Sequence, residues 1–358
     1  MSARSMSKSF AISALIGGVA FATATAVNAG PRVKWKMQSA WSTTVPLAGE
    51  SGVRFSKEVE DMSEGKFQIK FFDPGALVPA LEAFDAVSKG SIESAWTTPG
   101  YHTGKYAGLA FATTVPFGPQ IGEFLAWKWF GGGNEIRDEI YAKHNLIAFD
   151  AFSHGPETSG WFREPITNLD QLKGLKMRFF GLGARVMQKM GVSTQLLAGA
   201  DIYPALERGV IDATEYSMPI NDIKYGFHQI AKNNYYPGWH QQVSVSEFLV
   251  NREAYEKLPK AYQAMIKNAT QAQMIYTYAH GDARNFTPMM QMKDKYGVTN
   301  RRWDDDQLAK FEQAWLEVVK EESAKDEWFA KFADSYFAFR KQYKIWADAQ
   351  SINSTYLE

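Results

Sequence analysis

Residues 174–183 read GLKMRFFGLG, in which one cation, Arg178, lies among apolar residues and glycines. Within this stretch, residues 175–180 predict a buried strand that runs into a glycine-containing loop. Further short strands are predicted at 33–41, 66–72, 145–152 and 243–251. Because helical patterns separate them, we expect an α/β fold with mostly parallel sheets. This stretch alone does not decide whether Arg178 faces water, a structural carboxylate or a ligand.

Three helical patterns complete the expected fold. Residues 79–90 begin with Pro and end with Gly, as helices often do. Residues 254–279 place apolar side chains along one face, and the same spacing continues from Asp304. Because no long loop separates these elements, we expect two lobes joined by short crossing strands, with 243–251 as the best candidate for one.

Two segments are weakly similar, AVSKGSIESAW (86–96) and ALERGVIDATE (205–215). Each combines a helix end, a glycine, a β-branched residue and an acid before small residues. Ligands of α/β proteins bind beyond the carboxyl ends of strands. Both copies are therefore expected to end beside a ligand.

Composition narrows the class of protein. The 358 residues suffice for two lobes with their own cores, and 45% hydrophobic residues exclude a disordered chain. The 39 basic and 39 acidic residues cancel, so no strong field is expected to attract nucleic acid. The absence of cysteine excludes disulfides, a thiol nucleophile and Cys-bound zinc.

Residues 1–29 predict a secretory signal peptide. Arg4 and Lys8 form a short basic region, residues 10–27 carry no charge, and VNA (27–29) offers the small residues of a cleavage site. A membrane anchor, the alternative, needs about 20 strongly apolar residues, whereas Ser, Thr and Gly dilute this run. We therefore expect an exported protein.

Enzyme motifs are incomplete. FGLGAR (180–185) lacks the third glycine of a dinucleotide-binding fingerprint, and FGGGNE (130–135) lacks the Lys-Ser/Thr of a phosphate-binding loop. Neither HExxH nor GxSxG occurs. The six histidines are scattered, and a lone histidine is more often structural than catalytic. An enzyme is the weaker class on these grounds.

Polar chemistry concentrates in the middle of the chain, at Glu157, Arg178, Glu215 and Gln241. Arginine fits a carboxylate through its two-pronged guanidinium. Two carboxylates and an amide oxygen fit a hard cation. Simpler interpretations remain open at this point, with Arg178 in an ordinary ion pair and Glu157 in a solvated loop.

These residues lie in segments that resemble the solute-binding proteins of tripartite ATP-independent periplasmic (TRAP) transporters, in particular the branch that binds 2-oxo acids and related small monocarboxylates. The resemblance runs in family order from about Val33 into the C-terminal helices. It rests on GLKMRFFGLGARVMQKMG (174–191), GADIYPALERGVIDATEYSMPINDIKYGFHQIA (199–231) and YYPGWHQQ (235–242), with support from PGALVPALEAFDAVSKGSIESAW (74–96) and GWFREPI (160–166).

The resemblance implies a two-lobed periplasmic binding protein fold of the α/β class, with hinge strands, a long helix bridging the lobes and a helical C-terminus. It divides the chain into a signal peptide (1–29), lobe 1 (30–152, with a return segment at about 253–305), lobe 2 (153–250) and C-terminal helices (306–358). The bridging helix is expected within 254–279.

The resemblance also assigns a binding site. Arg178 occupies the position of the family's arginine that binds the ligand carboxylate. A cation, Ca²⁺ or Na⁺, is expected to bridge ligand and protein, bound by Glu157, Glu215, the backbone carbonyl of Tyr216, and Gln241. The acid at 157 and the amide at 241 are exchanged relative to the branch pattern, so the site keeps two carboxylates.

Three aromatic residues, Trp41, Tyr101 and Phe180, are expected to line the apolar side of the pocket, together with Tyr216. For each of them singly, core packing is an equally good interpretation.

The function implied is periplasmic capture of a small 2-oxo or 2-hydroxy monocarboxylate, such as pyruvate, 2-oxobutyrate or lactate, for TRAP membrane subunits. A homodimer through the C-terminal helices is possible, and no nucleic acid is expected as a partner. The alternatives are a binding protein for a sugar acid or dicarboxylate, a periplasmic metal-assisted lyase or hydrolase, and a sensor.

Overall fold

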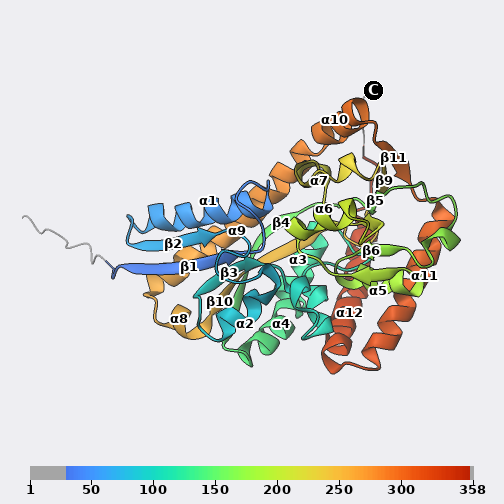
Figure 1. Cartoon of the computed structure of the whole chain (residues 1–358). Coiled ribbons are helices and arrows are strands. Elements are labelled where there is room, and N and C mark those ends of the chain that lie inside the picture. The colour runs from blue at the N-terminus through green and yellow to red at the C-terminus, as the bar shows by residue number, and fades with distance from the viewer. Residues whose placement is uncertain (1–29, 355–358) are drawn as a thin grey trace, which may run out of the picture.

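Two mixed β-sheets, each covered by helices, organise the chain (Figure 1). The structure, a computed structural model, describes residues 30–354, so the expected signal peptide at 1–29 lies outside the described residues. The α/β prediction is confirmed, and each expected strand has a counterpart in one of the two sheets.

The first sheet has the strand order β2-β1-β3-β10-β4. Its strands are β1 (Val33–Ser39), β2 (Phe67–Phe72), β3 (Ser94–Thr97), β4 (Leu146–His154) and β10 (Ser244–Asn251). Strand β1 runs parallel to β2 and β3, whereas β10 runs antiparallel to β3 and β4. Because β10 brings the chain back from the second sheet, it enters the first sheet in the opposite direction. The expectation of mostly parallel sheets is therefore wrong for this half of the sheet.

The second sheet has the strand order β11-β9-β5-β8-β6-β7. Its strands are β5 (Gly160–Phe162), β6 (Lys176–Arg178), β7 (Ser193–Gln195), β8 (Ala213–Thr214), β9 (Asn233–Tyr236) and β11 (Thr299–Arg302). Strand β11 pairs parallel with β9. The expected return of residues 253–305 to the first lobe is thus wrong for β11, since its backbone hydrogen bonds belong to the second sheet. The lobe boundaries otherwise stay a prediction.

Twelve α-helices surround the sheets in the described part of the chain. They are α1 (Ala48–Met62), α2 (Ala83–Ser88), α3 (Ile121–Phe130), α4 (Gly133–Ala142), α5 (Gly181–Lys189), α6 (Gly199–Glu207), α7 (Pro219–Tyr225), α8 (Arg252–Glu256), α9 (Lys260–Arg284), α10 (Phe286–Tyr296), α11 (Asp305–Ser323) and α12 (Glu327–Ala349). Within residues 30–354, every helix is too short or too polar to cross a bilayer.

The weak internal repeat corresponds to two copies of one local structure. Helix α2 leads through Gly90 into β3, and α6 leads through Gly209 into β8. Both glycines adopt left-handed backbone angles, with φ of 69° and 70°, which residues with a side chain rarely adopt. Each copy therefore turns the chain sharply from a helix into a strand that ends between the sheets.

Helix α9 bridges the two sheets, as expected. It packs against β4 and α1 of the first sheet, and Figure 1 shows it running on toward α7 and α10. Directly after its end, the Asn285 side chain accepts a hydrogen bond from the Ile220 amide of α7, at 3.2 Å. The predicted helix at 254–279 begins later, because Pro259 separates the short α8 from α9.

The two C-terminal helices share a core with the first lobe. Phe111, which lies in a 3₁₀ helix (Ala107–Ala112), is fully buried, and its ring centroid is 5.0 Å from that of Phe329 and 6.0 Å from that of Phe332. Trp315 of α11 packs on the same ring at 6.1 Å. Helix α11 also packs on α5, so this helical pair contacts both halves of the molecule.

Phe111→Ala should lower the free energy of unfolding by about 3–5 kcal/mol, because truncation leaves a cavity among rigid rings. Urea unfolding followed by circular dichroism measures this change. Phe130→Ala is the matched control, since Phe130 is 86% exposed and its loss should cost less than about 0.5 kcal/mol. Equal effects of the two changes would contradict the packing described here.

Candidate functional site

The candidate site begins at the carboxyl ends of two neighbouring strands. Arg178 is the last residue of β6, and Glu215 directly follows β8, which runs parallel to β6. Parallel strands end at the same edge of a sheet, so the two side chains meet there. Both are buried, with Arg178 1% and Glu215 0% exposed.

Arg178 is held from one side by Glu215 and the backbone. Its Nη1 lies 3.0 Å from Glu215 Oε2 and donates to the Glu215 carbonyl at 2.6 Å, and its Nε donates to the Leu197 carbonyl at 3.2 Å. Its Nη2 donates no hydrogen bond to any residue in the described range 30–354. The ordinary ion pair considered for Arg178 therefore exists, yet it leaves one edge of the guanidinium available to a ligand.

Glu157 and Gln241 come from the two segments that connect the sheets. Glu157 lies between β4 and β5, and Gln241 lies between β9 and β10. The Glu157 amide donates to the Gln241 carbonyl at 3.0 Å, which joins the two segments. Both side chains are buried, so the alternative of a solvated loop for Glu157 is wrong.

Four oxygen atoms of the predicted cation site lack donors. Glu157 Oε2, Glu215 Oε1 and Gln241 Oε1 are buried without a hydrogen-bond partner in the described chain. The Tyr216 carbonyl likewise accepts none of the hydrogen bonds formed among residues 30–354. Unpaired buried acceptors are costly unless another group satisfies them. A hard cation prefers this set of carboxylate, amide and carbonyl oxygens, so the residues fit such an ion.

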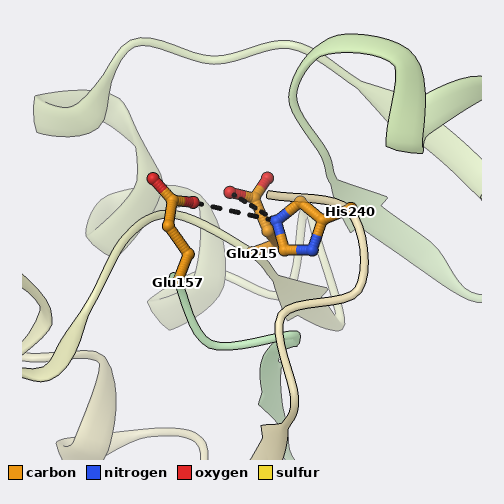
Figure 2. A group of neighbouring side chains, drawn as sticks. All are labelled: Glu157, Glu215 and His240. Atoms are coloured by element: carbon orange, nitrogen blue, oxygen red, sulfur yellow. Dashed lines mark ion pairs between the residues drawn. The ribbon is translucent and has the colours of Figure 1, made fainter. Parts of the chain in front are cut away.

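His240 is a member of the site that the sequence interpretation missed. Its Nε2 lies 3.5 Å from Glu215 Oε1 and 3.7 Å from Glu157 Oε2, and Figure 2 shows both carboxylates directed at the imidazole ring. One ligand atom from each of the three residues lies within 4.8 Å of the others. Six scattered histidines give no sequence signal as a group, but the place of His240 directly before Gln241 is a usable one.

The two carboxylates have opposite pKa shifts. Burial, followed by the nearby Glu215 charge, raises the pKa of Glu157 well above its usual value. Burial alone would also raise the pKa of Glu215, but Arg178, His240 and the Phe180 amide lower it below its usual value. Without a cation, the site therefore favours one ionised and one protonated carboxyl group.

Aromatic rings form the opposite wall of the site. The Tyr101 ring centroid is 5.9 Å from that of Trp41 and 5.5 Å from that of Phe180. All three rings line one small cavity. Its volume is about 40 Å³, counted as the space open to the centre of a water molecule. The same cavity is lined by Glu157, Arg178, Tyr216 and Gln241, and further by Thr98, His154, Ser217, Asn221, Ser244 and Ser246.

A small polar cavity between two sheets, closed by crossing segments, defines a two-lobed binding protein. The chain matches the model of bacterial extracellular solute-binding protein family 7 (DctP) over residues 37–326, so it belongs to this family of TRAP solute-binding proteins. It is 37% identical to a monocarboxylate 2-oxoacid-binding periplasmic protein of Nostoc sp., with 90% of this chain and 88% of the relative covered. The resemblance drawn from the sequence is therefore confirmed.

Solved structures agree with this assignment. A TRAP solute-binding protein of Bordetella bronchiseptica, with calcium and picolinate at its site, is 32% identical with a TM-score of 0.86, covering 89% of this chain and 95% of that one. A protein of Pseudoalteromonas atlantica with sodium and pyruvate is 31% identical with a TM-score of 0.85, covering 89% and 97%. The protein of Colwellia psychrerythraea has calcium and pyruvate bound, at 31% identity and a TM-score of 0.84, with the same coverage. The predicted two-lobed fold is thus confirmed.

Asp222 of α7 gives the ligand-free protein a testable pH dependence. It accepts a hydrogen bond from Trp161 Nε1 at 2.8 Å, its other oxygen has no partner among residues 30–354, and burial raises its pKa to about 8. Between about pH 4 and pH 8 the unfolded chain has lost this proton while the native protein keeps it. The free energy of unfolding should therefore fall as pH rises through this range.

Asp222→Asn removes this ionisation. Between the two pKa values, the free energy of unfolding should fall with pH less steeply in the variant than in the wild type. The difference between the two slopes should be about 1.4 kcal/mol per pH unit. Urea titrations at several pH values, with both proteins free of ligand, measure the two slopes. Identical slopes would contradict a protonated Asp222 in the native state.

Proposed function

We propose that this protein captures a small 2-oxo monocarboxylate of the pyruvate type, together with Ca²⁺ or Na⁺, for a TRAP transporter in the periplasm. The observation that carries the proposal is the small cavity lined by Arg178, Glu157 and Gln241, in which Glu157 and Gln241 each keep an oxygen without a partner among residues 30–354. The ligands of the Nostoc, Pseudoalteromonas and Colwellia relatives support the choice of acid and cation.

Different side chains would bind the ligand carboxylate and the cation. The free edge of Arg178 takes the ligand carboxylate through a charge-assisted hydrogen bond. Glu157, Glu215, Gln241 and the Tyr216 carbonyl hold the cation, which neutralises their charge and bridges to the ligand. The two carboxylates and the ligand sum to three negative charges, which Arg178 and a divalent ion balance, and this arithmetic favours Ca²⁺ over Na⁺.

The size of the cavity favours a small acid over the alternatives. Trp41, Tyr101 and Phe180 leave about 40 Å³ for the centre of a water-sized sphere, which suits a ligand of a few heavy atoms. A sugar acid or a larger dicarboxylate would need these buried rings to move. Membership of a solute-binding family likewise favours binding over the metal-assisted lyase or hydrolase.

Titration calorimetry tests the proposal. The wild type should bind pyruvate in the presence of Ca²⁺ or Na⁺, and removal of the cation, by chelating Ca²⁺ or by leaving Na⁺ out of the buffer, should weaken binding at least about tenfold. Pyruvate should be recovered unchanged after long incubation, whereas its conversion would favour an enzyme. Failure to bind pyruvate, 2-oxobutyrate or lactate with either ion would reject the substrate class.

Variants of Arg178 supply the control for this measurement. Arg178→Ala should abolish pyruvate binding, but it also leaves Glu215 buried without its partner and costs about 3–5 kcal/mol of stability. Arg178→Lys retains the charge and loses the planar fork, so it should fold and still bind pyruvate far more weakly. Arg185→Ala, at an exposed residue of α5, should bind like the wild type.

We also propose that a second copy of the chain packs on the end of α12. Ile345 and Trp346 are 76% and 59% exposed there, which is unusual for large apolar side chains. Trp346→Glu should then shift the mass measured by light scattering from dimer to monomer at the same protein concentration. A wild-type protein that is monomeric at high concentration would reject this contact.

A further inference from the structure

Two chain segments from different sheets meet beside the ligand cavity. Gly100 lies in a 3₁₀ helix (Pro99–His102) that directly follows β3 of the first sheet. Phe180 follows β6 of the second sheet and precedes α5. The Phe180 ring lies against the backbone of Gly100, so this contact joins the two halves of the molecule.

A side chain at position 100 has no room. A Cβ atom there would lie 2.8 Å and 2.9 Å from two atoms of the Phe180 ring, and closer still to its tip. Real Cβ contacts are essentially never this short. The backbone of Gly100 lies outside the left-handed region, so alanine is excluded by space alone.

Neither partner is free to give way. The Gly100 amide donates to Thr113 Oγ1 at 2.9 Å, which itself hydrogen-bonds Thr98 Oγ1 at 2.9 Å. The Phe180 amide donates to Glu215 Oε2 at 2.9 Å, and the edge of its ring meets Tyr101. The carboxylate that pairs with Arg178 thus fixes the Phe180 backbone, and the contact with Tyr101 restricts the ring.

We infer that Gly100 is a positioning residue for ligand binding: it provides the notch in which Phe180 seats when the two lobes close. This inference rests on the proposed function, because closure around a ligand gives the notch its purpose. We expect the two segments to separate in an open form, where a Cβ at position 100 would no longer meet the Phe180 ring. A ligand stabilises closure only through contacts made in the closed form, so an obstructed notch lowers affinity although Gly100 itself does not line the cavity.

Gly100→Ala should therefore weaken pyruvate binding in Ca²⁺ by roughly tenfold or more, since overpacking at a rigid contact opposes closure. Small-angle scattering should show that the variant, with pyruvate at a concentration that compacts the wild type, keeps the larger radius of the open form. Its urea unfolding without ligand should match that of the wild type.

Gly104→Ala is the matched control, because a Cβ there meets nothing within 4 Å and the backbone lies outside the left-handed region. It should bind pyruvate like the wild type. In a Phe180→Ala background the ring is gone, and adding Gly100→Ala should then change the affinity less than about twofold.

The same measurements distinguish a wrong role for Gly100 from a wrong proposed function. A wild type that binds pyruvate while Gly100→Ala binds equally well overturns the inference and leaves the proposed function intact. A wild type that binds none of the acids overturns both. A Gly100→Ala chain that folds only when Phe180 is also alanine overturns the inference as well, because the two residues would then already touch before closure.

Discussion

The buried ion pair between Arg178 and Glu215 is the constraint around which the site is arranged. A buried charge is tolerated only when paired and hydrogen-bonded, and Glu215 meets this need with one oxygen shared by Arg178 Nη1 and the Phe180 amide. Its other oxygen lies beside His240 and Glu157 and has no hydrogen-bond partner in the part of the chain that the structure describes. The same pair therefore orients the guanidinium, fixes the start of α5, and leaves an acceptor of Glu215 directed at His240.

The chain path explains why these groups converge. Arg178 and Glu215 come from adjacent parallel strands of the second sheet, whereas Glu157 and Gln241 lie on the two connections to the first sheet. Any movement of one sheet relative to the other thus displaces the connections against the strand ends. Because the site is built across this junction, ligand affinity depends on the relative position of the two lobes. Ligand binding and lobe position are therefore coupled.

Local patterns in the sequence predict the main strands and the long helix, because periodicity and glycine placement act over short range. The direction of β10 and the pairing of β11 with β9 were not predictable in this way, since strand pairing is decided by contacts distant in sequence. Arg178, Glu157, Glu215 and Gln241 were named through a resemblance, which carries such long-range information. His240 was missed because a single histidine has no periodic signature, and its distance to two carboxylates shows what its place beside Gln241 only suggests.

Helix α9 has a mechanical consequence. At 25 residues it is about 38 Å long, and a hydrogen-bonded helix resists stretching far more than it resists pivoting at its ends. Because it rests on the first sheet and is tied to α7 just beyond its C-terminus, it acts as a rigid strut between the halves. Relative motion of the two halves is therefore expected to be a rotation about the contacts at the ends of α9, because a change of their separation along its axis would have to stretch the helix.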